Sequence, residues 1–266
     1  MAPTNKIDEK LKNSISSNKI SIATFMTTDY PERNTFIDIS VKFCEMGVDI
    51  LEFGIPFSDP IAEGRTIQQT TFKVLENGTN ITSCFDSISS IRKMGYTTPI
   101  VIMGYYNPIL RYGLESFTKK ANQLGVDGII VADLPVEESS HLRDLCKNNS
   151  IHLIQMLAPT STSERIKKTC EIASGFIYCV SLTGVTGARK SIGPEIEMLV
   201  NQIRTHTNIP IMVGFGISNR EHVETIGKFA DGAIIGSALL DTIGQSIGEE
   251  AISRACDFVK TLMDLP

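Results

Sequence analysis

The sequence lacks the signals of several common protein classes. None of its 266 residues belong to an apolar run of about 18 or more, the length of a membrane span. Residues 1–14 are polar and of mixed charge, unlike a secretory signal. The 25 basic and 30 acidic residues give a net charge of -5 and form no long blocks of one sign. A nucleic-acid footprint or a polybasic membrane patch is therefore not expected, and we expect small molecules or another protein as partners.

Metal and disulfide signatures are also missing. The six cysteines form no CxxC pair and have no zinc-like spacing to histidine. The four histidines, too, lack a regular ligand spacing, so no metal is predicted. Most of the cysteines are expected to be buried apolar residues in a reducing compartment, which predicts a cytoplasmic protein. An organelle protein whose transit peptide had been removed would look the same.

Eight short apolar runs recur along the chain with amphipathic segments between them. The runs are nearly continuous in apolar residues, as expected for parallel strands that are covered on both faces. They span residues 21–27, 49–55, 99–105, 128–133, 152–158, 175–181, 210–216 and 232–238. Residues 35–46 and 196–204 show helical spacing between them.

This alternation predicts a single-domain (β/α)8 barrel over residues 1–266. A doubly wound open sheet is the alternative, but no GxGxxG follows the first run, and glycines and polar residues are spread over the ends of many runs. Turn chemistry at 77–82 predicts two short helices in the second unit. Helical spacing near the start predicts a capping helix at about residues 5–17 over the N-terminal mouth of the barrel.

Glu52 is a charged residue inside an apolar run. Alternation places it on the face opposite Leu51 and Phe53. An inward carboxylate would be desolvated, and its pKa would rise into the range of a general acid or base. The alternative is an exposed glutamate, or a buried one with a structural partner.

The segment after this run, 54–68, contains two prolines, two glycines and the acids Asp59 and Glu63. Such a loop has a restricted backbone and lies where a barrel enzyme places its reacting groups. Two acids in different environments can divide acid and base roles. For Asp59 alone, a solvated position is the favoured interpretation.

Three glycine-rich or hydroxyl-rich segments follow the last strands. Residues 181–189 could close as a lid, while 214–218 and 235–238 offer bare backbone amides near the ends of the seventh and eighth runs. Backbone amides and a helix start can hold a phosphate without Lys or Arg. Phosphate binding is therefore predicted. Tyr105 and Tyr178 are interpreted as core residues, with the pocket of a flat aromatic substrate as the alternative.

Residues 51–64, LEFGIPFSDPIAEG, closely resemble the signature of the tryptophan synthase alpha family, L-E-[LM]-G-x-P-F-S-D-P-x-A-D-G. The similarity continues almost end to end, through segments 103–108, 131–135, 157–160, 183–187, 214–216 and 236–237. The resemblance implies a (β/α)8 barrel that cleaves indole-3-glycerol phosphate to indole and glyceraldehyde 3-phosphate in tryptophan biosynthesis. It implies no cofactor for this half reaction.

The resemblance also implies roles for single residues. Glu52 would be the principal acid/base group, Glu63 would stabilise the indole nitrogen, and Tyr178 would lie near the reacting side chain. Phe25 and Tyr105 would line the indole pocket. The remaining substrate and phosphate positions would be Thr186, Gly187, Gly214, Phe215, Gly216, Gly236 and Ser237.

A beta subunit that uses pyridoxal phosphate is the implied partner, in an alpha2beta2 heterotetramer. The matching interface positions are Asp59, Asn107, Pro108 and Pro135. Three residues depart from the family pattern: Glu63 replaces aspartate, Arg65 replaces proline and Asp29 replaces glycine. These departures keep two alternatives open, a catalytically weakened barrel that mainly binds and activates the beta subunit, and a stand-alone lyase that releases indole.

Overall fold

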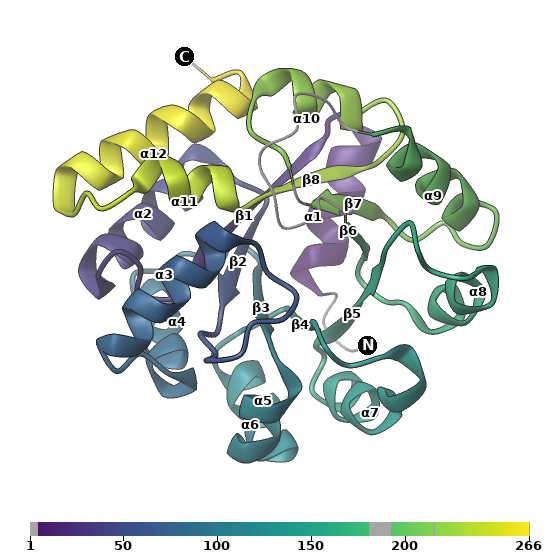
Figure 1. The fold of residues 1–266 in the computed structure, drawn as a ribbon, viewed down its shortest axis with the longest axis horizontal. Helices are drawn as coiled ribbons and strands as arrows, with labels where there is room; N and C mark the ends of the chain where they lie inside the picture. The colour runs from purple at the N-terminus through teal and green to yellow at the C-terminus, as the bar shows by residue number, and fades with distance from the viewer. Residues whose placement is uncertain (1–4, 181–192, 215, 266) are drawn as a thin grey trace.

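Eight parallel strands close into a barrel in sequence order (Figure 1). The computed structural model describes residues 5–180, 193–214 and 216–265. The strands are β1 (Ser21–Thr27), β2 (Ile50–Gly54), β3 (Ile100–Gly104), β4 (Gly128–Val131), β5 (His152–Leu157), β6 (Ile177–Val180), β7 (Ile211–Gly214) and β8 (Gly232–Ile235). The predicted (β/α)8 barrel is confirmed, and the doubly wound alternative is wrong because β1 pairs with both β2 and β8.

Helices surround the barrel, and Figure 1 shows them as an outer ring with α1 lying behind the strands. They are α1 (Lys6–Ser16), α2 (Arg33–Met46), α3 (Arg65–Glu76), α4 (Ile81–Lys93), α5 (Tyr106–Tyr112), α6 (Leu114–Gln123), the short 3-10 helix η1 (Val136–Glu138), α7 (Ser140–Asn148), α8 (Ser163–Ile172), α9 (Pro194–Arg204), α10 (Arg220–Ile226), α11 (Ser237–Ile243) and α12 (Gly248–Met263). The two helices predicted in the second unit are present as α3 and α4.

Most of the predicted strands extend one to three residues beyond the C-terminal end of the observed strand. The eighth run, for example, was expected to reach residue 238, but β8 ends at Ile235 and Ser237 already begins α11. After β2 and β3 the apolar character continues beyond the ladder because Ile55 and Tyr105 are also buried. Hydrophobicity therefore locates each strand but does not mark where its ladder ends.

The predicted capping helix is present as α1, and its contacts hold it at the N-terminal ends of the strands. Asn5 caps the helix and donates from Nδ2 to the carbonyl oxygen of Asp127, 2.8 Å away. Lys10 pairs with Asp49 at 3.4 Å, and Asp8 lies 3.1 Å from the His152 ring. Ile7 and Leu11 are fully buried. The helix therefore closes this end of the barrel.

An aspartate stands directly before each of the strands β2, β4 and β8. In each case an aspartate accepts a hydrogen bond from the backbone N–H at or near the start of the preceding strand. These bonds are Ile22 to Asp49 at 2.8 Å, Ile100 to Asp127 at 3.0 Å and Ile211 to Asp231 at 2.7 Å. The repeated Gly-Val-Asp at 47–49 and 125–127 is the sequence signal of two of these bonds. The aspartates fix the register of neighbouring strands.

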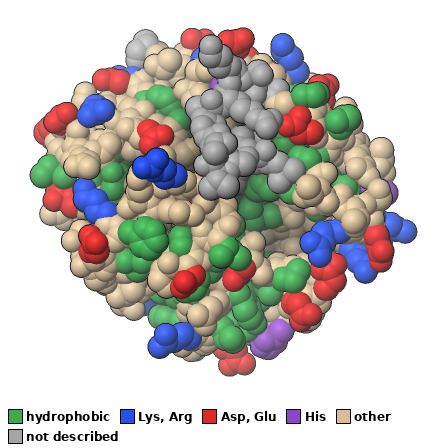
Figure 2. All heavy atoms as spheres, in the orientation of Figure 1, with side chains coloured by type: hydrophobic (Ala, Val, Ile, Leu, Met, Phe, Trp, Pro, Cys, Tyr) green, Lys and Arg blue, Asp and Glu red, His purple; other side chains and the backbone are tan. Residues whose placement is uncertain are grey.

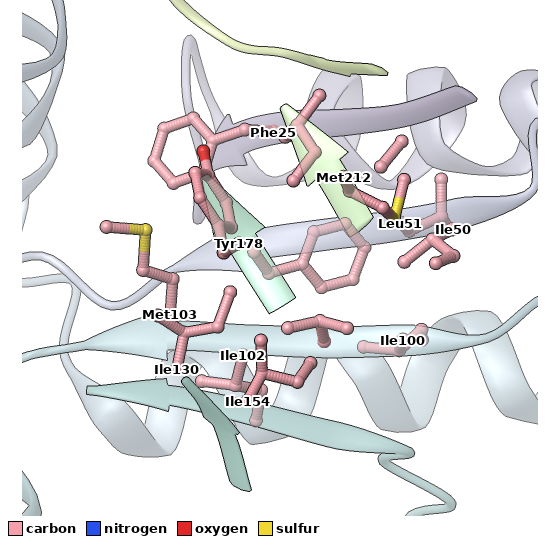
Figure 3. Close-up of a cluster of buried hydrophobic side chains, with 14 of the residues drawn as sticks. Phe25, Ile50, Leu51, Ile100, Ile102, Met103, Ile130, Ile154, Tyr178 and Met212 are labelled. Carbon is pink, nitrogen blue, oxygen red and sulfur yellow. The ribbon is translucent and has the colours of Figure 1, made fainter. Parts of the chain in front are cut away.

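The strands alternate between an outer face, which packs on the helices, and an inner face. Phe53 on β2 packs edge to face against Phe36 of α2, with ring centroids 4.8 Å apart. Its neighbour Glu52 therefore faces the barrel interior, as alternation predicts. Figure 3 shows part of the buried cluster, in which Phe25, Tyr178 and Met212 come from different strands. The interior is a packed core rather than a pore.

Asp29, which stands where the family pattern has glycine, adopts a left-handed backbone with φ at 60°. Such a conformation strains most non-glycine residues, although aspartate tolerates it better than most. The buried Asp29 carboxylate accepts a 2.6 Å hydrogen bond from Ser87 of α4. Burial raises the pKa of this carboxyl, and the Ser87 bond partly opposes that rise. The side chain thus ties the turn after β1 to α4.

Candidate active site

Glu52 lies in the barrel interior with no hydrogen-bonding partner among the described residues. Its side chain is 1% exposed, and neither carboxylate oxygen has a partner within the described part of the chain. Burial raises the pKa of Glu52 from 4.5 to about 8. The alternative of an exposed glutamate is wrong. At neutral pH the group is mostly protonated and poised to give or take a proton.

Glu63 is a second carboxyl at this end of the barrel, on the loop between β2 and α3. Burial raises its pKa from 4.5 to about 7, while a hydrogen bond from the Tyr105 hydroxyl partly opposes the rise. The Tyr105 oxygen also accepts a bond from the backbone N–H of Ala62 at 3.0 Å. Tyr105 is thereby fixed against the loop, with its ring 5.2 Å from that of Phe57. Near pH 7, Glu63 is divided between its ionised and protonated forms.

Tyr178 faces Glu52 across the interior. β2 and β6 lie on opposite sides of the closed barrel, yet the charge of Glu52, after burial, contributes to the raised pKa of Tyr178. The hydroxyl lies so close to β7 that a Cβ placed on Gly214 would be 2.3 Å from it. A residue larger than glycine at 214 would displace Tyr178. The structure thus brings together the predicted residues Glu52, Tyr178 and Gly214.

Phe25 packs against two glycines at the same end. A Cβ on Gly54 would lie 2.7 Å from the Phe25 ring, and one on Gly236 would lie 3.3 Å from it. Gly236 directly precedes α11, which starts at Ser237. Gly216 has a φ of 79°, which favours glycine. The predicted glycines and Ser237 therefore follow the ends of β7 and β8, as the phosphate prediction requires.

Three predicted positions lie outside the described residues. They are Thr186, Gly187 and Phe215, together with the predicted lid over residues 181–189.

The predicted partner-interface residues follow three successive strands. Asp59 is exposed after β2 and accepts a 2.6 Å hydrogen bond from Ser58. Asn107 and Pro108 lie in the first turn of α5, and Pro135 is exposed after β4. A hydrogen bond of 2.7 Å from the Tyr106 N–H to Asp133 joins the last two segments. The four residues therefore share the C-terminal side of the barrel.

Two large apolar side chains are exposed near these residues. Ile61 is 82% exposed between Asp59 and Glu63, and Leu110 is 50% exposed on α5. Figure 2 shows charged side chains scattered singly over the visible face, with hydrophobic side chains between them. This surface has no concentration of one charge, consistent with the composition.

A cavity of about 360 Å³, which the sequence did not predict, lies where β4 and β5 diverge. Pairing between these strands ends at Ile130 and Ile154. The lining includes Ala132, Pro135, Gln155, Met156 and Arg165. Met156 of this lining is the register partner of Tyr178 on the next strand. The feature of the sequence that could have indicated this cavity is Gln155, a buried polar residue within an apolar run.

The described residues contain neither a cluster suited to a metal ion nor a helix suited to cross a membrane. Within 5–180, 193–214 and 216–265, no cluster of three or more His, Cys, Asp or Glu side chains has the arrangement of a metal site. Over the same ranges, no helix combines the length and apolar character needed to cross a membrane.

Comparisons with known proteins agree with this geometry. A family model for the tryptophan synthase alpha chain matches residues 11–263. The tryptophan synthase alpha chain of Roseiflexus castenholzii is 43% identical over 244 residues, which cover 92% of this chain and 94% of the relative. The Saccharomyces cerevisiae tryptophan synthase is 38% identical, over 97% of this chain and 37% of the yeast protein.

Solved structures show the same relationship. Mycobacterium tuberculosis tryptophan synthase superposes with a TM-score of 0.90 at 29% identity, covering 98% of both chains. A chain of the tryptophan synthase a2b2 complex of Pyrococcus furiosus superposes with a TM-score of 0.86 at 36% identity, covering 92% of this chain and 98% of that one. The chain belongs to the tryptophan synthase alpha chain family.

Proposed function

We propose that this chain is a carbon–carbon lyase that cleaves indole-3-glycerol phosphate to indole and glyceraldehyde 3-phosphate, with Glu52 as its acid/base group. The carboxyl of Glu52 carries the assignment, because it is buried and has no hydrogen-bonding partner among the described residues. It lies two residues before the C-terminal end of β2. In (β/α)8 barrels this end holds the reacting groups. Family membership supplies the reaction class.

The cleavage is a retro-aldol step with balanced proton transfers. Protonated Glu52 gives a proton to C3 of the indole ring, which turns the ring into an electron acceptor. The resulting carboxylate takes the proton of the adjacent glycerol hydroxyl, whose oxygen becomes the aldehyde carbonyl oxygen. The carbon–carbon bond breaks, and its electron pair restores the aromatic indole. A pKa of about 8 leaves Glu52 protonated at neutral pH for the first step.

Glu63 and Tyr178 support this step from two sides. The Glu63 carboxylate, held by Tyr105, would stabilise the positive charge that develops at the indole nitrogen. Tyr178 lies opposite Glu52 and limits where the reacting carbons can sit. Phe25 and Tyr105 would flank the aromatic ring.

The phosphate is assigned to the ends of β7 and β8. Gly214 ends β7 beneath Tyr178, Gly216 has a φ of 79°, and Gly236 directly precedes Ser237, which starts the following helix. Thr186, Gly187 and Phe215 complete this proposed set. Backbone N–H groups bind a dianion without a cationic side chain.

We further propose that the chain acts in the cytoplasm with a beta subunit, as an alpha2beta2 heterotetramer. The contact surface would comprise Asp59, Asn107, Pro108 and Pro135, with the exposed Ile61 beside them. A P. furiosus relative forms an a2b2 complex. The pyridoxal phosphate of the overall synthesis belongs to the beta subunit, and the alpha reaction uses side chains alone.

The test is indole release from indole-3-glycerol phosphate by the purified chain, with and without a beta subunit. Glu52→Gln should lower turnover by about 10²-fold to 10⁴-fold, the typical contribution of a general acid or base. The matched control is Glu171→Gln, an exposed glutamate on α8, which should keep wild-type turnover. Unchanged turnover in Glu52→Gln would overturn the assignment. A wild-type chain that binds and activates the beta subunit but releases no indole would favour the role of a binding partner.

A further inference from the structure

Helix α3, which follows Glu63 directly, has no N-terminal cap of its own. Its N-cap residue is Gly64, which offers no side chain, and its first turn contains no acidic residue. Arg65 at the first position adds a positive charge where the helix dipole favours a negative one. The start of α3 therefore needs a partner from elsewhere in the fold.

Asp241 of α11 places a carboxylate beside this first turn. Its Oδ1 accepts a 2.9 Å hydrogen bond from the Thr66 hydroxyl, in the first turn of α3. The two residues are 175 positions apart, so this bond joins the second βα unit to the last one. A carboxylate at this place compensates for the missing first-turn acid, because it lies near the positive end of the α3 dipole.

The first turns of α3 are in turn bonded to the loop that carries Glu63. Gln68 donates from Nε2 to the carbonyl oxygen of Glu63 at 2.9 Å and to that of Pro60 at 3.4 Å. Further along α3, a buried hydrogen bond of 2.8 Å joins the hydroxyls of Thr70 and Thr27 of β1. The position of α3 therefore determines where the Glu63 backbone lies.

Helix α11 is anchored independently. Tyr30, after β1, donates a hydrogen bond to the carbonyl oxygen of Gly244 just beyond the end of α11. Leu239, Leu240 and Ile243 of this helix are buried. Asp241 thus extends from a fixed helix whose first residue, Ser237, belongs to the proposed phosphate site.

We propose that Asp241, through Thr66, is a positioning residue that holds Glu63 in register with the phosphate-binding end of α11. The inference rests on the proposed function, because it assigns to Asp241 the spacing between two parts of one substrate site. Loss of the bond should leave the barrel folded and misplace the Glu63 carboxyl. Small misplacements of a reacting group lower rate more than binding.

The experiment compares Asp241→Ala and Thr66→Val with Asp257→Ala. Asp257 is an exposed aspartate of α12 that accepts a bond from Ser253 at 3.3 Å within that helix, and it serves as the matched control. Each test variant should lower kcat by roughly threefold to tenfold with KM changed by less than about twofold. The double variant should be no slower than the slower single variant, because both remove one bond. Thr66→Ser, which keeps the hydroxyl, should restore kcat.

A Glu63→Gln background separates the outcomes. There, Asp241→Ala should have no further effect, because the group that it positions is already gone. An equal loss of kcat in both backgrounds, or an Asp241→Ala variant indistinguishable from Asp257→Ala, would overturn the positioning role while leaving the proposed function intact. Wild-type turnover in Glu63→Gln would instead contradict the role proposed for Glu63 itself.

Discussion

Buried carboxyl groups at the two ends of the barrel differ in whether they have hydrogen-bonding and ion-pair partners among the described residues. At the N-terminal end, Asp127 accepts the Ile100 N–H at 3.0 Å and pairs with Lys6 and Arg92 at 3.0 and 3.4 Å. At the C-terminal end, Glu52 has no hydrogen-bonding partner among the described residues. Both side chains are less than 10% exposed. The partnered carboxylate stabilises the fold, whereas the unpartnered carboxyl opposes folding when charged and is available for chemistry.

The two ends of the barrel also differ in the elements that surround their carboxyl groups. Helix α1 covers the N-terminal end and contributes Lys6 and Lys10 to ion pairs with Asp127 and Asp49. Towards the C-terminal end, Glu52 of β2 and Glu63 of the following loop have raised pKa values. Stability and reactivity therefore occupy different ends of one scaffold, as in other enzymes of this architecture.

Asp127→Ala should remove the ion pairs and the hydrogen bond of this carboxylate and have the largest effect on the free energy of unfolding. It leaves the partly buried Arg92 without its carboxylate and the buried Ile100 N–H without its acceptor, a loss of about 3 kcal/mol, to which Lys6 adds little because it is 37% exposed. Urea unfolding should show this loss, while turnover per folded molecule stays at the wild-type value. Asp144→Ala, at a less buried helix position, is the control. Lost turnover with unchanged stability would contradict the division between the two ends.

Glu63→Gln should change the pH dependence and the rate of indole release. If Glu52 acts protonated and Glu63 acts ionised, kcat/KM falls below about pH 7, where Glu63 gains its proton, and above about pH 8, where Glu52 loses its own. The variant should lose the acid-side fall and about 10-fold to 100-fold of the rate at its optimum. The measurement is the pH profile of indole release. A wild-type profile that breaks only near pH 4.5 would show that neither carboxyl has the proposed environment.

Two glycines provide a smaller, paired comparison. A Cβ on Gly214 would lie 2.3 Å from the Tyr178 hydroxyl, and one on Gly128 would lie 2.7 Å from the end of the Ile154 side chain. Both Gly→Ala variants should lose about 1–3 kcal/mol of stability through overpacking. Gly214→Ala should in addition lower turnover of the folded protein by about tenfold, because it displaces Tyr178. Equal turnover in the two variants would show that the position of Tyr178 does not matter to the reaction.

The sequence predicted much of this picture for a physical reason. Short, nearly continuous apolar runs are a local property, so all eight strands could be predicted from neighbouring residues, and the inward side of Glu52 from the alternation of side chains along a strand. Family resemblance added the glycines after β7 and β8, whose requirement becomes clear only when Tyr178 and Phe25 are seen against Gly214 and Gly236.

Contacts between distant segments could not be predicted in this way. The bond from Thr66 to Asp241 spans 175 positions, and no local pattern marks either residue. The left-handed Asp29 is stabilised by Ser87, which lies 58 positions away. The aspartate before each of β2, β4 and β8 was a missed local signal, since Gly-Val-Asp occurs twice in the sequence.

The reaction requires Glu52 to be buried without a hydrogen-bonding partner among the described residues, which lowers the stability of the fold when the carboxyl is charged. The most direct test of this requirement is the free energy of unfolding of the wild type and of Glu52→Gln from about pH 5 to pH 9. The folded pKa of about 8 exceeds the ordinary 4.5, so between these values the folded state holds a proton that the unfolded state has released. Wild-type stability should therefore fall relative to Glu52→Gln as pH rises through this window and level off above it. Parallel curves, or a wild type that gains stability over Glu52→Gln with rising pH, would contradict the account.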